Sequence, residues 1–189
     1  MSEHIDRLAL KFKAGDAEAF GEIYDLLFDK IYRFIYFKTY HKETAEDITS
    51  RTFLKALGGI NGFNPNKARF TTWIYRIARN AVIDYYRTRK KNSDIDDIWD
   101  IKDPSDMVLD LETKEYIAKL HTALNTLSPD VREIIILRIW EGMSYREIAG
   151  IVGKSEAGCK MAFSRAVKEL RGKIAIVVAV LTVLVSRIG

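Results

Sequence analysis

Apolar residues recur at helical spacing along almost the whole chain, and this periodicity limits the fold more than any other feature. No segment combines strict alternation of apolar and polar residues with the turn residues of a β-hairpin. The pattern therefore predicts an all-α protein. Its 189 residues suit one or two domains, since a domain usually has about 100–200 residues.

Glycines and capping residues divide the amino-terminal half into four expected helices. The first ends at Gly15, after which Asp16 can cap a long second helix that is rich in aromatic residues. Most of those rings are expected to pack in a core. The third helix is expected to end before Gly58, and a loop over residues 61–66 separates it from the fourth, over residues 69–91.

The fourth expected helix interleaves aromatic rings with cations. At about 3.6 residues per turn, one face can be buried while the other meets a nucleic-acid strand. Cations neutralise phosphates, and an exposed ring can stack on an unpaired base. The alternative is a core helix with a solvated, charged back. The polar face comprises Arg69, Trp73, Arg76, Asn80, Asp84 and Arg87, and the apolar face Ile74, Ile77, Ala78, Ala81 and Tyr85.

Charge is strongly segregated along the chain, although the net charge is only +4. Residues 67–91 hold eight cations and one carboxylate, whereas residues 92–115 hold nine carboxylates and two lysines. Such asymmetry indicates a binding surface beside a linker. The acidic stretch contains Pro104 and few core-type residues, which favours a linker, although Ile98 and Trp99 could dock elsewhere.

The carboxy-terminal half carries the signals of a helix-turn-helix. Ser128, followed by Pro129, can begin one helix, and residues 144–147 form a capping box that begins the next. Gly153 ends that helix and Ser155 can cap the last one. A short helix, a tight turn and a basic second helix are typical of DNA-binding proteins, although similar helical hairpins occur in proteins that bind no DNA.

The last expected helix also has two faces. An exposed polar side could hydrogen-bond base edges in the major groove, which is wide enough to admit one helix. The residues expected to be buried are Cys159, Phe163, Ala166 and Leu170, and those expected on the opposite side are Lys160, Ser164, Arg165 and Lys168.

Several classes of protein are disfavoured by what the sequence lacks. A single cysteine excludes an internal disulfide, and three isolated histidines offer no spacing typical of a metal site. The amino terminus has no export signal, so a cytoplasmic location is expected. Cys159 lies on a predicted buried face, and no serine sits in a nucleophile elbow. We therefore expect neither an enzyme nor a bound cofactor.

Four segments together resemble one protein family. Residues 45–57, residues 70–80, Leu127-Ser-Pro and Tyr145-Arg-Glu-Ile-Ala are similar to the extracytoplasmic-function (ECF) sigma factors of bacterial RNA polymerase. The resemblance extends over residues 17–171. It implies a subunit that brings core RNA polymerase to promoter DNA and opens it, with an anti-sigma factor as a further candidate partner.

The resemblance also implies three sets of contact residues. Those matching the family's polymerase-docking segment are Glu46, Asp47, Ser50 and Phe53. Those expected at the minus-ten promoter element are Lys67, Arg69, Trp73, Arg76, Asn80 and Arg87, with a core position as the alternative for Trp73. Those expected at the minus-thirty-five element are Lys154, Ser155, Lys160, Ser164, Arg165 and Lys168.

Two features depart from the family. Gly158 stands where threonine is common, and Met161-Ala162 replace a common serine and arginine, so contacts at the minus-thirty-five element are expected to differ. The second departure is an apolar run at residues 174–185. As a helix it would cover about 18 Å, too short to cross a membrane alone. It could pack on the second domain, lie against a membrane or bind a partner, and burial is favoured.

We therefore expect two helical domains joined by an acidic linker, the second containing the helix-turn-helix. The expected divisions are residues 1–91, 92–111, 112–172 and an apolar tail at 173–189. Two other functions remain as alternatives: a helix-turn-helix regulator that binds duplex DNA without polymerase, and a membrane-associated interaction protein that acts through the tail.

Overall fold

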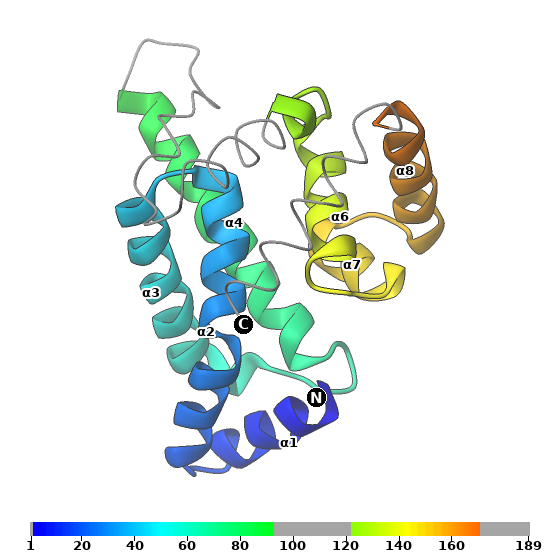
Figure 1. Cartoon of the computed structure of the whole chain (residues 1–189). Coiled ribbons are helices and arrows are strands. Elements are labelled where there is room, and N and C mark those ends of the chain that lie inside the picture. The colour runs from blue at the N-terminus through cyan, green and yellow to red at the C-terminus, as the bar shows by residue number, and fades with distance from the viewer. Residues whose placement is uncertain (1, 93–121, 171–189) are drawn as a thin grey trace, which may run out of the picture. The chain divides into compact units, whose positions relative to one another are not determined.

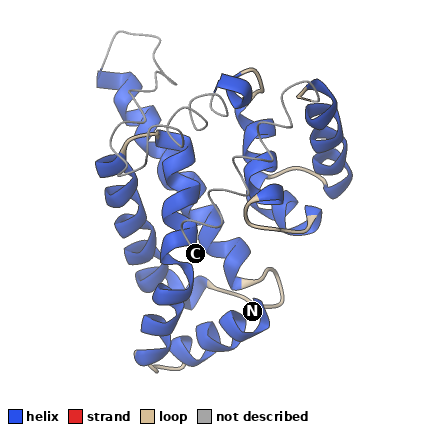
Figure 2. Cartoon of the chain, in the orientation of Figure 1, coloured by secondary structure: helices blue, strands red, loops and turns tan. Residues whose placement is uncertain are grey.

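The computed structural model describes residues 2–92 and 122–170, which form helices, turns and loops with no β-strand among them (Figure 2). The chain divides into two compact units, residues 1–102 and 103–189. The expected all-α architecture of two helical domains is confirmed. The acidic linker and the apolar tail lie outside the described residues.

Unit 1 is a bundle of three long helices with a shorter helix across one end (Figure 1). The long helices are α2 (Glu18–Thr39), α3 (Lys42–Gly59) and α4 (Phe70–Asn92). The shorter helix α1 (Ser2–Lys13) packs on α2 and α4. A 3-10 turn, η1 (Ile60–Gly62), follows α3 directly.

The junction between α2 and α3 is built from aromatic and imidazole side chains. Tyr40 ends α2 in the left-handed conformation, with φ of 48°. The Nδ1 atom of His41 accepts a hydrogen bond of 3.3 Å from the Thr44 N–H and so caps α3. At the start of α2 the N-cap residue is Ala17 and not Asp16 as expected, although the Asp16 carboxylate, one residue earlier, accepts a hydrogen bond of 3.3 Å from the Ala19 N–H.

The end of α3 corrects the expected boundary. The helix was expected to stop before Gly58 but continues to Gly59, and η1 takes up part of the loop expected at residues 61–66. Lys13 Nζ donates a hydrogen bond of 2.7 Å to the Phe63 carbonyl oxygen, which attaches the rest of this loop to α1.

The core of unit 1 is largely aromatic and isoleucine-rich, as expected for α2. Phe34 and Tyr75 are fully buried and meet edge to face, with ring centroids 5.1 Å apart. This contact joins α2 to α4. Tyr24 is an exception to the expected burial, because 40% of it is exposed.

Unit 2 contains a helical segment at residues 122–125 and three packed helices. They are α6 (Pro129–Ile139), α7 (Tyr145–Val152) and α8 (Glu156–Glu169). Arg132 is buried on α6, and its Nε donates a hydrogen bond of 3.1 Å to the Leu124 carbonyl oxygen. The Arg132 guanidinium thus donates hydrogen bonds to backbone carbonyl groups in the segment before α6, where the helical hydrogen-bond pattern is interrupted.

The local signals of the helix-turn-helix act largely as expected. Ser144 and Glu147 form a complete capping box at the start of α7, and Gly153 ends the helix with φ of +73°, a conformation that glycine adopts without strain. Ser155 caps α8 by accepting a hydrogen bond of 3.0 Å from the Gly158 N–H. Ser128 occupies the N-cap of α6, but its side chain makes no capping hydrogen bond.

Candidate nucleic-acid and protein interfaces

Helix α4 has the two faces that its sequence indicates. Ile74, Ala78 and Ala81 are buried against the bundle. The residues exposed on the other side are Arg69, Arg76, Asn80 and Arg87, and Lys67 is exposed in the preceding loop. We call Lys67 and these four residues the α4 face. Its cations extend from the loop before α4 along about five turns of the helix and can therefore meet several successive phosphates of a strand.

Trp73 lies at the edge between this face and the core. Its ring is half-buried and packs at 5.7 Å from Phe63 and 5.4 Å from Phe70, measured between ring centroids. The ring also lies 3.7 Å from the position that a Cβ of Gly59 would occupy. Trp73 is therefore part of the packing that holds the loop, and it retains some exposed surface.

The position of α4 depends on a residue that the sequence did not single out. Asp6 of α1 accepts a hydrogen bond of 2.7 Å from the backbone N–H of Phe70, the first residue of α4. An acidic side chain at this end satisfies an unpaired N–H and is favoured by the helix dipole. No local signal near residue 70 could have identified it, because the two residues are 64 positions apart.

On α3, the expected docking residues are divided between surface and core. Glu46, Asp47 and Ser50 are exposed, and the Asp47 carboxylate forms an ion pair of 2.8 Å with Arg51. Phe53, in contrast, is only 3% exposed. Its ring packs against those of Phe20, Tyr24 and Phe28, with the closest centroids 4.8 Å apart. Phe53 therefore supports this side of α3 from within.

Two leucines on α3 extend the exposed surface. Leu54 is 67% exposed and Leu57 is 45% exposed, and they follow Asp47 and Ser50 at helical spacing. The helical spacing alone could have identified both leucines from the sequence. Glu46, Asp47, Ser50, Leu54 and Leu57 form what we call the α3 face.

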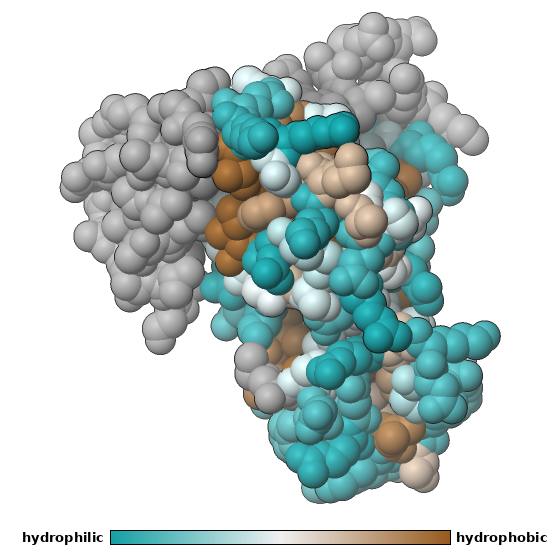
Figure 3. Space-filling model, turned by 90° about the vertical axis from the view of Figure 1, so that its right-hand side faces the viewer, coloured by the Kyte–Doolittle hydropathy of each residue, from teal (hydrophilic) through white to brown (hydrophobic). Residues whose placement is uncertain are grey.

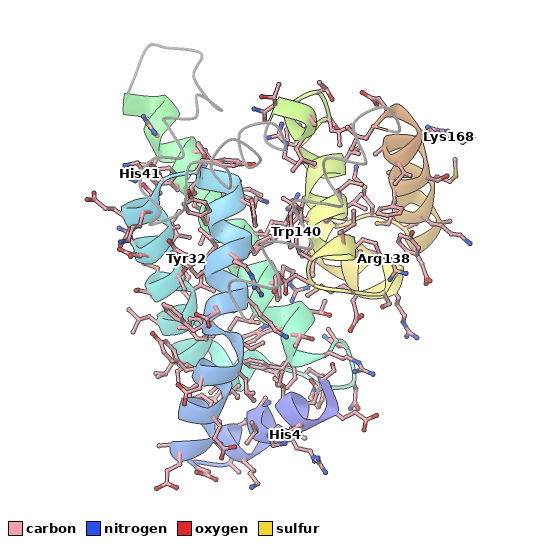
Figure 4. The ribbon with its side chains drawn as sticks, in the orientation of Figure 1. His4, Tyr32, His41, Arg138, Trp140 and Lys168 are labelled. Atoms are coloured by element: carbon pink, nitrogen blue, oxygen red, sulfur yellow. The ribbon has the colours of Figure 1, made fainter. Side chains whose placement is uncertain are left out.

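Glu46 also influences the neighbouring helix. Burial raises the pKa of the Tyr32 phenol on α2, and the negative charge of Glu46 raises it further. Both effects disfavour a phenolate. Figure 4 shows Tyr32 between α2 and α3. The phenol thus stays protonated and can donate a hydrogen bond at this edge of the α3 face.

Helix α8 has a polar face and a packed face. Cys159 and Ala166 are buried, and the half-buried Phe163 meets Tyr145 of α7, with ring centroids 5.9 Å apart. Burial raises the pKa of the Cys159 thiol, an effect larger than the opposing charge of Lys154. The exposed residues Lys160, Ser164, Arg165 and Lys168 make up the α8 face; Lys168 is labelled in Figure 4.

The turn before α8 is held to the rest of unit 2. Lys154 Nζ forms an ion pair of 2.9 Å with the Asp130 carboxylate of α6. Arg138 of α6 donates a hydrogen bond of 2.6 Å to the Met143 carbonyl oxygen, and its guanidinium lies over the Tyr145 ring at 4.7 Å. These contacts fix α7 on α6 and so orient the helix-turn-helix.

Hydrophilic residues cover most of the described surface on the side seen in Figure 3, and hydrophobic residues appear there in small patches. Within residues 2–92 and 122–170, no helix has the length and apolarity needed to cross a membrane. In the same residues, no three His, Cys, Asp or Glu side chains gather where they could hold a metal ion.

Comparison with known proteins gives consistent matches for both units. Residues 23–92 match the Sigma-70 region 2 family, and residues 117–170 match the Sigma-70, region 4 family. The ECF RNA polymerase sigma factor SigM of Bacillus subtilis is 31% identical over 79% of this chain and 91% of its own. The ECF RNA polymerase sigma factor BldN of Streptomyces coelicolor is 35% identical over 89% of this chain, which spans 65% of BldN.

A solved structure is similar as well. The sigma factor RpoE of Bartonella quintana, crystallised with the anti-sigma factor NepR, matches with a TM-score of 0.64 and 26% identity. The match covers 82% of this chain and 96% of RpoE.

Proposed function

Because this chain belongs to the ECF RNA polymerase sigma factors, we propose that it binds core RNA polymerase, directs it to promoters and helps to open the DNA. It acts in the cytoplasm, where the polymerase works, and makes no covalent change itself. The observation that carries the proposal is the α4 face, a row of exposed cations with an aromatic ring at its edge.

The α4 face is proposed to hold the minus-ten element as a separated strand. Arg69, Arg76 and the other cations neutralise phosphates, and Asn80 offers an amide to a base edge. The exposed part of Trp73 can stack on an unpaired base, which offsets part of the few kcal/mol that unstacking costs. Packing against Phe63 and Phe70 keeps that ring in place beforehand.

The α8 face is proposed to read the minus-thirty-five element in the major groove. Ser164 and Arg165 can reach base edges, while Lys160 and Lys168 contact phosphates. Gly158 and Ala162 bring no polar side chain to this surface, whereas Met161 brings an exposed apolar one. We therefore expect a base preference here that differs from that of relatives with threonine and arginine at these positions.

The α3 face is proposed to dock on the polymerase. It combines the carboxylates of Glu46 and Asp47 with the exposed side chains of Leu54 and Leu57. A charged rim beside an apolar patch is the usual composition of a specific protein interface. An anti-sigma factor is a second candidate partner for this chain, because RpoE was solved with one; if it covers the α3 face, it should compete with core polymerase.

Reconstituted transcription tests the main proposal. Purified chain and bacterial core polymerase are incubated with a library of genomic fragments, and the 5′ ends of the transcripts are mapped. Defined start sites that require the chain are expected. The absence of any such site would contradict the proposal, and tight, sequence-specific duplex binding without polymerase would favour a stand-alone regulator.

A further inference from the structure

A pocket between α3 and α4 has no role in the function proposed above. Its volume is about 410 Å³, within the range of about 300–1,000 Å³ typical of small-molecule sites. The side chains of α3 that line it are Ile48, Arg51 and Lys55, and those of α4 are Ala81, Asp84, Tyr85, Thr88 and Arg89.

The lining joins an apolar floor to a cationic rim. Ile48 and Ala81 are buried, and Tyr85 beside them is half-buried. Arg51, Lys55 and Arg89 contribute three positive charges against the single carboxylate of Asp84. A ligand with a flat ring and an attached anion can use both parts, because the ring packs on the floor while the anion contacts the rim. An isolated phosphate or an aliphatic anion has no flat ring to pack on the floor.

Two cations at the rim, Lys55 and Arg51, are available to such a ligand. Lys55 is exposed and has no ion-pair partner among the residues that the structure describes. Arg51 pairs with Asp47, but both side chains are more than half exposed, so the pair contributes little and can be exchanged. One oxygen of Asp84 forms an ion pair of 2.9 Å with Arg87, which partly neutralises the carboxylate.

Polar groups in the pocket add specificity. The Tyr85 hydroxyl lies 3.4 Å from Nη1 of Arg89 and 3.5 Å from the Thr44 hydroxyl, so it belongs to a short polar chain at one side. The second oxygen of Asp84 can accept a hydrogen bond from an exocyclic amine or a sugar hydroxyl. An aromatic base, a sugar and a phosphate together match these three kinds of group.

We propose that this pocket binds a nucleotide. The chemistry is the same for a free nucleotide and for one unit of a single strand that passes the adjoining α4 face, and the test separates these sources. Binding of a free nucleotide does not depend on the function proposed above, whereas binding of a strand rests on the proposed role of the α4 face; neither requires polymerase.

The test measures binding of three probes to the full chain by calorimetry at low salt: ATP, pyrophosphate and a short oligo(dT) strand. Lys55→Glu reverses a charge at the rim. Lys42→Glu, on an exposed lysine of the same helix outside the pocket, is the matched control. Lys55→Glu should weaken ATP or oligo(dT) at least about fivefold, because a nearby cation becomes an anion, while Lys42→Glu should have less than half that effect.

The probes separate the sources. An effect on ATP alone assigns a free nucleotide, and an effect on oligo(dT) alone assigns a strand. Thr88→Trp, which fills the mouth without changing the charge, should also abolish binding, with thermal melting as the check on folding. Equal effects of the two lysine variants, no binding of either nucleotide probe, or pyrophosphate binding as tightly as ATP would overturn the proposal.

Discussion

The Asp6 carboxylate on α1 accepts a 2.7 Å hydrogen bond from the backbone N–H of Phe70, so one helix caps another that lies 64 residues away. This contact sets where α4 begins. The loop that leads into α4 carries Lys67, and the α4 face follows directly. The α4 face therefore depends on α1, which makes no contact with DNA in the proposed function.

Replacing Asp6 tests this dependence. Asp6→Ala removes the acceptor and should cost about 1 kcal/mol of stability, as the loss of an N-cap does. Asp6→Asn keeps an acceptor and loses only the charge, so it should cost less. Urea denaturation of both variants measures the difference. Equal stability of Asp6→Ala and the unaltered chain would show that the contact is not a cap in solution.

Asp47→Lys tests the α3 face. The substitution replaces an exposed carboxylate, breaks its ion pair with Arg51 and places two cations side by side, so polymerase binding should be lost. Stability should change by less than about 1 kcal/mol, because exposed ion pairs contribute little. Co-purification with core polymerase is the measurement, and Glu22→Lys on α2 is the charge-matched control. Normal binding by Asp47→Lys would contradict the docking assignment.

Arg76→Ala tests the α4 face. Loss of one phosphate contact should weaken promoter binding by the polymerase complex and lower the slope of log affinity against log salt by about one. Asn80→Ala should leave that slope unchanged, because an amide neutralises no phosphate. Binding is measured across a salt series, with Lys11→Ala on α1 as the control. An unchanged slope in Arg76→Ala would place this guanidinium away from the backbone of the DNA.

Gly158 offers a test of the start of α8. A Cβ added there would lie 3.0 Å from the Ser155 Oγ, which already accepts a hydrogen bond from the Gly158 N–H. Gly158→Ala should thus gain less than the roughly 0.8–1.0 kcal/mol expected from helix propensity. In a Ser155→Ala background the crowding is gone and the gain should be larger. A double-mutant cycle measures the coupling; additive effects would mean that the cap moves aside freely.

Cys159 should be protected and should stay protonated. Because burial raises its pKa, the folded protein keeps this proton at pH values where the unfolded chain has lost it. This contribution to stability is complete below about pH 8.5, the ordinary cysteine pKa, and declines as the pH rises toward the folded value. Alkylation by iodoacetamide should be far slower in the native protein than in urea; equal rates would contradict burial.

The sequence was sufficient for the elements that depend on local signals. Ser144, Gly153 and Ser155 act through neighbours within a few residues, and the faces of α4 and α8 follow from helical period. It was insufficient where a distant residue decides the outcome. No residue near Phe70 in the sequence indicates that Asp6 caps the helix. Phe53 is buried because three aromatic rings of α2 pack against it.

The residues that end α2 and begin α3 could not be predicted from the sequence for a different reason. A left-handed residue at a helix end is usually glycine or asparagine, and here it is Tyr40, which is held by burial and by a hydrogen bond to Tyr36. Histidine is also a rare N-cap. Since neither residue follows its intrinsic preference, residue preferences alone do not predict where α2 ends and α3 begins.

On α8 the residues that pack and the residues that are exposed do not overlap. Cys159 and Ala166 hold the helix to the unit, while Ser164 and Arg165 contribute nothing to its interior. The exposed residues can therefore be exchanged in evolution with little effect on folding, and under the function proposed above such exchanges would change which DNA sequence the helix prefers.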